Sequence, residues 1–246
     1  DPRSRLSNPW CNTSSNFIII GVIKEKRSLN MSPSCNQQAQ QLASGVKALG
    51  LNCSSQQIEQ LLNYLHMLQR WNKAYNLTAI REPSQMVRLH LLDSLAINPF
   101  IQGVRHIIDV GTGPGLPGIP LAILNPEINF TLLDSNGKKT RFLFQAINDL
   151  SLANVKEINQ RVETYQPEKS FDIVLSRAFS SISDMLAQCD HLVCDSGCFL
   201  AMKGKKPDSE LSQITKDYKV VDLSQINVPQ VDSERHLIKI IKTGVS

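Results

Sequence analysis

A glycine-rich segment, residues 106–134, constrains the fold of this chain most strongly. A short apolar run ends in the turn Gly-Thr-Gly-Pro-Gly at residues 111–115; a helix-length segment and a second apolar run ending at Asp134 follow. A strand, a tight loop, a helix and a second strand that ends in a carboxylate form the unit with which α/β proteins bind nucleosides. The sequence therefore predicts a parallel sheet with a nucleoside-type cofactor at the carboxyl ends of its strands.

The loop glycines and the carboxylate each have a chemical reason to be there. Gly111 and Gly113 permit the positive φ that a sharp turn requires, and they leave room for a ligand against the backbone. The carboxylate of Asp134 can accept hydrogen bonds from both hydroxyls of a ribose. The alternative is that Asp134 caps the helix that begins near Asn136.

Two features argue against a dinucleotide-binding protein. The NAD fingerprint has a third glycine where this chain has Leu116, and the tighter Gly-x-Gly-x-Gly spacing favours a neutral or amino-acid-bearing nucleoside. The last two apolar runs, residues 218–228 and 236–242, have no helix-length segment between them, so we expect an antiparallel hairpin. A dinucleotide-binding dehydrogenase would continue instead into another βαβ half.

Apolar periodicity predicts the other elements. We expect further strands at residues 155–158, 171–175 and 198–202, and helices at residues 136–150, 183–192 and 207–216. Helical spacing of leucines from Ser55 to about Trp71, and again after Pro83, predicts a helical cap at residues 41–101 that precedes a core at residues 102–246. Residues 1–40 are rich in Ser, Asn, Pro and Gln and are expected to form a disordered arm.

Composition excludes several classes of protein. No apolar run approaches the roughly 18 residues of a membrane helix, and the scattered cysteines indicate a reducing, cytoplasmic compartment. The spacings of Cys189, His191, Cys194 and Cys198 differ from the close pairs of zinc ribbons, so we expect no metal site. The net charge of +4 permits an acidic partner such as RNA. The absence of a heptad repeat favours a monomer.

Charged and aromatic residues outside the loop suggest further contacts. Arg177 follows the fourth strand at the mouth of the sheet, where ligands bind; the alternative is a surface ion pair. Val162 and Glu163 follow the third strand, where an adenine edge would lie; the alternative is a solvated loop. A basic and aromatic set in the cap could face RNA: Trp71, Lys73, Tyr75, Asn76, Arg81, Arg88 and His90. The alternative for the two large aromatics is that they pack the helices onto the core.

Seven motifs follow one another along the chain: WNKAYNLT, HLLDSL, DVGTGPGLPGIPLAI, TLLDSNGKKTRFL, FDIVLSRAF, LAMKG and ERHLIKI. Taken together, they resemble the RsmG (GidB) family of bacterial 16S ribosomal RNA guanine-N7 methyltransferases. The resemblance covers about residues 56–242. It implies an α/β, Rossmann-like class I methyltransferase with a seven-stranded mixed sheet, with S-adenosyl-L-methionine as cofactor. It also implies cofactor contacts at Gly111, Gly113, Leu116, Asp134, Val162, Glu163 and Arg177.

The reaction that this resemblance implies needs no general base, because guanine N7 carries a lone pair and no proton. Orientation of the two reactants is then the main catalytic task. Arg177 and Lys203 are the candidates for positioning the RNA substrate, with support from Lys138, Lys139, Arg141, Lys205 and Lys206. Two alternatives remain open: a non-enzymatic protein that binds the cofactor or RNA, and a methyltransferase that acts on a small molecule or a protein.

Overall fold

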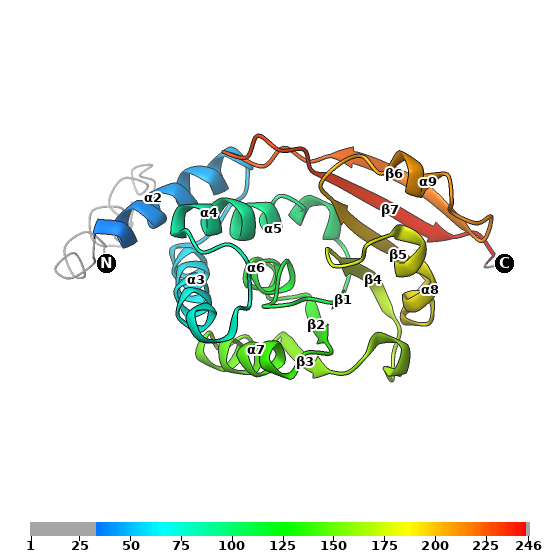
Figure 1. Cartoon of the computed structure of the whole chain (residues 1–246), viewed down its shortest axis with the longest axis horizontal. Helices are drawn as coiled ribbons and strands as arrows, with labels where there is room; N and C mark the ends of the chain where they lie inside the picture. Colours follow the sequence, from blue (N-terminus) through cyan, green and yellow to red (C-terminus); the bar gives the residue numbers. More distant parts are fainter. Residues whose placement is uncertain (1–32, 245–246) are drawn as a thin grey trace, which may run out of the picture. The chain divides into compact units, whose positions relative to one another are not determined.

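Seven strands form one mixed sheet in the order β3-β2-β1-β4-β5-β7-β6 (Figure 1). The computed structural model describes residues 33–244, with side chains from residue 36. The strands are β1 (His106–Val110), β2 (Asn129–Asp134), β3 (Val155–Asn159), β4 (Phe171–Ser176), β5 (Val193–Lys203), β6 (Tyr218–Gln225) and β7 (His236–Lys242). The first five strands are parallel, and β7 pairs antiparallel with both β5 and β6. The predicted mixed sheet and terminal hairpin are confirmed.

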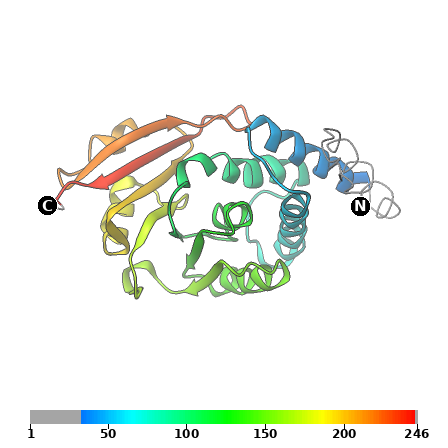
Figure 2. The ribbon, with the colours of Figure 1, turned by 180° about the vertical axis from the view of Figure 1, so that it is seen from behind.

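Helices cover both faces of the sheet (Figure 2). They are α2 (Pro33–Ala48), α3 (Ser55–Tyr75), α4 (Pro83–Met86), a π-helical turn (Val87–Leu92), α5 (Asp93–Leu95), α6 (Gly118–Leu124), α7 (Gly137–Asp149), α8 (Ile182–Cys189) and α9 (Asp208–Leu211). Short 3₁₀ turns lie at Asn98–Ile101, Val162–Thr164 and Asp190–Leu192.

Two hydrophobic clusters hold these layers together. Alternate residues of each strand point to opposite faces: Ile107 packs with α3, α6 and α7, whereas Ile108 packs with α8. The first cluster also contains Leu61 and Leu92 from the cap, and residues 38–246 form one compact unit. The predicted cap and core therefore share a single hydrophobic cluster.

Several predicted boundaries differ from the structure. Residues 33–40 of the predicted arm lie in α2, because Leu42 and Val46 give this polar segment a buried stripe; residues 1–32 lie outside the described residues. The helix predicted at 207–216 is only α9, since Leu211 and Ile214 supply apolar contact for one turn. The strand predicted at 198–202 begins earlier, at Val193, and its register with β4 shifts. The helix predicted at 183–192 ends in a 3₁₀ turn.

Candidate functional site

The glycine loop folds from the end of β1 over the end of β2. Gly111 has a φ of +66°, and a Cβ there would lie 2.7 Å from the Cβ of Ala178. Its N–H donates to the carbonyl of Leu133 at 2.9 Å. Gly113 has a φ of +62° and donates its N–H to Oδ2 of Asp134 at 2.9 Å. Both conformations favour glycine over residues that carry a Cβ.

A buried carboxylate inside β1 holds the far side of this loop. Oδ2 of Asp109 accepts hydrogen bonds from Oγ1 of Thr112 at 2.6 Å and from the N–H of Gly118 at 2.9 Å. Burial raises the pKa of Asp109 to about 6, and its Oδ1 has no partner among the described residues. Sequence reasoning missed Asp109 as a loop anchor. The available signal was an acidic residue within an otherwise apolar buried strand.

Asp134 joins the loop to α7. Its Oδ2 lies 3.6 Å from Nζ of Lys139, and its Oδ1 accepts from the N–H of Asn136 at 2.8 Å. The N-cap of α7 is Asn136, whose own side chain accepts from the N–H of Lys138 at 2.9 Å. The alternative role of Asp134 as the helix cap is therefore wrong.

A cavity of about 330 Å³ opens beside the loop, within the size range of small-molecule sites. It is lined by Val110, Gly111, Leu133, Asp134, Ser135, Lys139, Gln160, Arg161, Val162, Glu163, Ala178, Phe179 and Gln188. Four of the predicted cofactor contacts meet here. Gly113 and Leu116 do not line this cavity: Leu116 is 2% exposed and packs in the core. Arg177 lines a neighbouring cavity instead.

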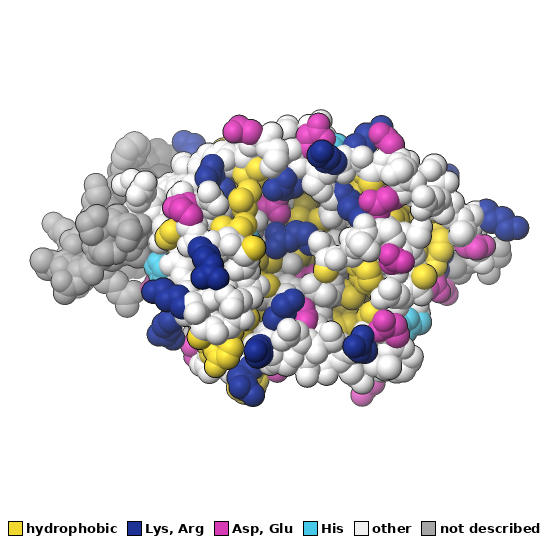
Figure 3. All heavy atoms as spheres, viewed as in Figure 1, with side chains coloured by type: hydrophobic (Ala, Val, Ile, Leu, Met, Phe, Trp, Pro, Cys, Tyr) yellow, Lys and Arg dark blue, Asp and Glu magenta, His cyan; other side chains and the backbone are white. Residues whose placement is uncertain are grey.

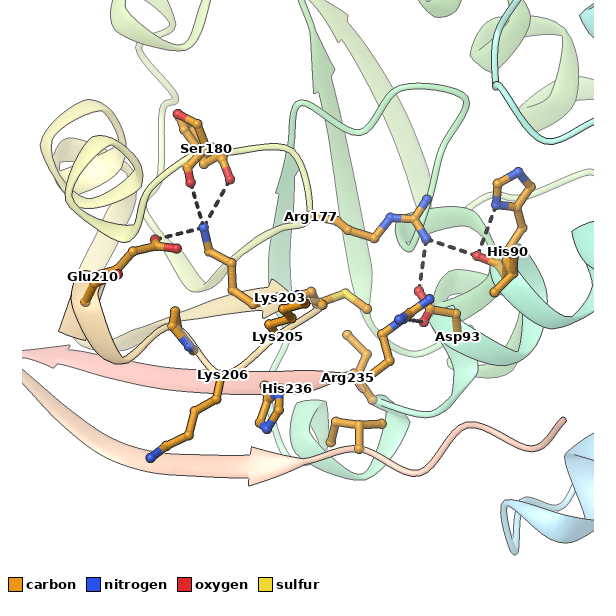
Figure 4. Close-up of a pocket in the computed structure, with 18 of the residues that line it drawn as sticks. His90, Asp93, Arg177, Ser180, Lys203, Lys205, Lys206, Glu210, Arg235 and His236 are labelled. Atoms are coloured by element: carbon orange, nitrogen blue, oxygen red, sulfur yellow. Dashed lines mark hydrogen bonds and ion pairs between the residues drawn. The ribbon is translucent and has the colours of Figure 1, made fainter. Parts of the chain in front are cut away.

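The neighbouring cavity, of about 710 Å³, lies at the carboxyl ends of β4 and β5 (Figure 4). Its wall includes residues from the π-helical turn, the start of β7 and the segment between β5 and α9. Phe179 lines both cavities, so the two spaces adjoin at this ring. A π-helical turn is rare and is often found at functional sites.

Two arginines converge on one buried carboxylate in this larger cavity (Figure 4). The side chain of Asp93 is 4% exposed; its Oδ2 accepts from Nη1 of Arg177 at 3.1 Å and its Oδ1 accepts from Nε of Arg235 at 2.6 Å. Arg177 therefore makes an ion pair, as the alternative held, but with a buried partner inside a cavity. Sequence reasoning did not single out Asp93 or Arg235.

His90 is a buried, neutral part of the same wall. Burial and the charge of Arg177 lower the pKa of its imidazole to about 4. Its Nδ1 lies 3.1 Å from the carbonyl of Leu89, which can only accept, so Nε2 accepts from Oγ1 of Thr78 at 2.9 Å. His90 is 3% exposed and does not belong to an exposed basic surface.

Lys203 positions the loop that carries Arg177 and Phe179. Its Nζ donates to the carbonyls of Phe179 and Ser180 at 3.3 and 3.1 Å and pairs with Glu210 at 2.9 Å. Glu210 also accepts from the N–H of Ile182 at 2.7 Å. Lys203 therefore lines the larger cavity and also holds the loop of Phe179 and Ser180 that forms part of its wall.

Comparison with known proteins decides the family. The model of the GidB family, described as rRNA small subunit methyltransferase G, matches residues 57–238. The chain belongs to this family. A ribosomal RNA small subunit methyltransferase G from Shewanella amazonensis is 50% identical over 204 residues, 83% of this chain and 98% of that protein. The same-named protein from Shewanella loihica is 48% identical over 206 residues, 84% of this chain and 99% of that protein.

Solved structures outside the GidB family share the fold at low sequence identity. The StiE O-MT structure has a TM-score of 0.52 at 10% identity, covering 71% of this chain and 82% of that one. The N-methyltransferase NodS from Bradyrhizobium japonicum, solved with S-adenosyl-L-homocysteine, has a TM-score of 0.50 at 12% identity, covering 72% and 98%. These similarities concern the fold alone.

Metal-binding clusters and membrane-spanning helices are absent from the part of this GidB-family chain that the structure describes. No group of three or more His, Cys, Asp or Glu there is arranged to hold a metal ion, and Cys189, Cys194 and Cys198 are free thiols. Within the same residues, every helix is too short or too polar to cross a membrane.

Proposed function

We propose that this protein transfers a methyl group from S-adenosyl-L-methionine to N7 of a guanine in 16S ribosomal RNA. Membership of the GidB family and the name shared by its relatives support an rRNA methyltransferase. The observation that carries the assignment of roles is the pair of cavities that adjoin at Phe179. We assign the smaller one to the cofactor and the larger one to the target nucleotide.

The smaller cavity has the chemistry that the cofactor requires. A carboxylate has about four acceptor positions. Asp134 uses two for backbone N–H groups, which leaves acceptors for a ribose diol. Gly111 presents bare backbone, and Val162 with Glu163 would flank the adenine. When bound, S-adenosyl-L-methionine supplies a methyl group on a positively charged sulfur.

The larger cavity suits a nucleotide within a polyanion. Five cations line it, namely Arg177, Lys203, Lys205, Lys206 and Arg235, against the two carboxylates Asp93 and Glu210, so 5 − 2 leaves +3. Nδ1 of His236, which also lines this cavity, is buried and has no hydrogen-bond partner among the described residues. Buried polar atoms are usually paired, so this nitrogen is available to a substrate group.

The residues of the larger cavity orient the base and remove no proton. Nε and Nη2 of Arg177 make no hydrogen bond with other described residues, so they can donate to guanine O6 or to a phosphate. Nε2 of His90 already accepts a hydrogen bond, which is consistent with a structural role for that side chain. Guanine N7 needs no general base, and the rate gain comes from alignment and exclusion of water.

The direct test is methylation of small-subunit RNA in vitro with the purified protein, followed by aniline cleavage at N7-methylguanine. Naked RNA and assembled small-subunit particles should be compared. We expect one cleavage site that depends on the cofactor. Binding of the cofactor with no RNA modification would favour a non-enzymatic protein and contradict the proposal. We also propose that the protein acts as a monomer in the cytoplasm, where its RNA substrate is assembled.

A further inference from the structure

Two aromatic side chains that line neither cavity are exposed. Phe144 on α7 is 57% exposed and Tyr75 at the end of α3 is 38% exposed, which is unusual for large apolar groups. Neither side chain lines the smaller or the larger cavity. They invite a role outside the methyl-transfer site.

The contacts between α3 and α7 place the end of α3, which carries Tyr75, beside the start of α7, the helix that carries Phe144. Nε2 of Gln60 donates to the carbonyl of Leu150 at 3.0 Å, and the rings of Trp71 and Phe142 lie 5.6 Å apart. The two helices therefore pack antiparallel, with the end of α3 beside the start of α7. The ring of Tyr75 lies 5.2 Å from that of Trp71, at an interplanar angle of 31°.

Exposed cations lie on the same two helices as these aromatics. Lys138, Arg141 and Phe144 follow one another at three-residue spacing, so they share one exposed face of α7, and Lys73 is exposed near the end of α3. Among the described residues, none of these three cations has an ion-pair partner, and the acidic residue of α7, Asp149, lies at its far end. Figure 3 shows Lys and Arg side chains gathered over the ends of α3 and α7.

The surface continues toward the larger cavity. The loop after α3 is tied back to that helix, because Asn72 accepts from the N–H of Thr78 at 2.9 Å and donates to the carbonyl of Ile80 at 3.4 Å. Ile80 lines the larger cavity, and Arg81 beside it is exposed and donates to Asn76 at 2.7 Å. The loop after α3 therefore connects the wall of the larger cavity to the end of α3.

We propose that Lys73, Tyr75, Lys138, Arg141 and Phe144, here called the α3–α7 ridge, dock single-stranded ribosomal RNA outside the target nucleotide. The cations contact phosphates, and unpaired bases stack on the two aromatics. Alternation of exposed aromatics and unpaired cations is the pattern by which proteins bind single-stranded nucleic acid. A protein partner fits less well, since a stable interface needs about 800 Å² per partner with an apolar centre. The inference rests on the proposed function and adds a second contact region to it.

Phe144→Ser tests the stacking contact, with Phe144→Trp as the aromatic rescue. We expect Phe144→Ser to raise KM for substrate RNA at least about fivefold, since stacking on one aromatic is worth that much or more. Phe144→Trp should restore KM. Affinity for S-adenosyl-L-homocysteine, measured by calorimetry, and the thermal midpoint should stay at the wild-type values, because Phe144 is exposed and does not line the cofactor cavity.

Lys138→Gln combined with Arg141→Gln tests the phosphate contacts. The salt dependence of RNA binding should fall by about 1.4 in log–log slope, from about 0.7 for each lost contact to a single strand. Lys216→Gln combined with Lys219→Gln is the matched control, because Lys219 lies on β6, at the opposite edge of the sheet from the side that α7 covers. This control pair should leave the slope unchanged.

Three outcomes would overturn the inference: an unchanged KM in Phe144→Ser, an equal effect in the control pair, or a wild-type dimer that dissociates in Phe144→Ser with no change in RNA binding. The wild-type protein separates this inference from the proposed function. If the wild type does not methylate RNA, the proposed function fails; if it does and the ridge variants behave as wild type, only the ridge assignment fails.

Discussion

Replacement of Asp93 by Asn tests whether one carboxylate positions both arginines of the larger cavity. The two carboxylate oxygens of Asp93 each bind a different guanidinium, at 3.1 Å for Arg177 and 2.6 Å for Arg235. Asn keeps the size of the side chain and one acceptor. Its amide NH₂ group would face the N–H of the other arginine, so only one of the two contacts can persist.

The size of the effect follows from burial. Removal of one partner from a fully buried ion pair costs about 3–5 kcal/mol. The side chains of Arg177 and Arg235 are 29% and 23% exposed, so solvent screens part of this cost. We expect Asp93→Asn to lower the free energy of unfolding by about 2 kcal/mol and the thermal midpoint by about 4–8 °C.

The kinetic effect should exceed the effect on stability. Arg177 would lose its fixed orientation against the substrate, and a misplacement of about 1 Å can cost about 100-fold in rate. We therefore expect kcat/KM for RNA to fall about 100-fold. Affinity for S-adenosyl-L-homocysteine should not change, since neither arginine lines the smaller cavity. A fall in that affinity would instead support the cofactor contact that the family resemblance implies for Arg177.

Asp190→Asn is the matched control. Asp190 also bridges two partners, the hydroxyl of Tyr218 at 2.7 Å and Nζ of Lys242 at 3.1 Å, but its side chain is 47% exposed and lies outside both cavities. Its replacement should leave kcat/KM unchanged and should lower the free energy of unfolding by no more than a surface ion pair contributes, about 0.5 kcal/mol. Wild-type kinetics in Asp93→Asn, or equal effects in the two variants, would refute the positioning argument.

Three further predictions concern the loop, the buried titratable groups and the rim. Gly111→Ala should weaken S-adenosyl-L-homocysteine binding about tenfold or more in calorimetry, because it adds a steric clash to the roughly 1–2 kcal/mol of a left-handed backbone. Gly113→Ala should weaken binding less, because its Cβ would meet only Nζ of Lys139, at 4.0 Å. The raised pKa of Asp109 makes unfolding free energy fall as pH rises from about 4 to 6, and the lowered pKa of His90 makes it rise from about 4 to 6.5, so the two trends oppose each other in the wild type. Urea titrations should follow the difference in unfolding free energy between each variant and the wild type from pH 4 to pH 7. This difference should rise by about 3 kcal/mol for Asp109→Asn and fall by about 3 kcal/mol for His90→Asn. A difference that does not change with pH would contradict both assignments. Lys203→Met should lower kcat/KM for RNA and leave cofactor affinity unchanged, because it removes the bonds that hold the loop of Phe179; wild-type RNA kinetics in this variant would contradict the positioning role of Lys203.

Features set by local sequence were predictable. The strands of the core are short apolar runs between turn residues, and the glycine loop follows β1 directly, so the order of residues along the chain is enough to place Gly111 near Asp134. The antiparallel hairpin at the end of the sheet was predictable because no helix-length segment separates the last two apolar runs. Each of these inferences uses residues fewer than about 30 positions apart.

Features set by packing were not predictable in the same way. Asp93 and Arg235 are 142 positions apart in the chain, and only the antiparallel placement of β7 beside β5 brings the start of β7 to the cap. The sequence left open whether Trp71 and Tyr75 pack onto the core or face solvent. The ring of Trp71 contacts Phe142 in the interior, whereas Tyr75 is exposed. Side-chain burial of this kind depends on tertiary contacts that no local period records.

The charges of the larger cavity resolve a conflict in the chemistry. Transfer to N7 leaves the purine positively charged, and unpaired cations beside the base would oppose that charge. The Asp93 carboxylate reduces the two arginines to a net +1, and Glu210 neutralises Lys203. Lys205 and Lys206 are exposed, where phosphates and solvent can screen them, and Nζ of Lys206 also pairs with Oδ1 of Asp208 at 2.7 Å. The two paired carboxylates, buried Asp93 and half-buried Glu210, therefore let one cavity attract a polyanion and still tolerate a cationic product.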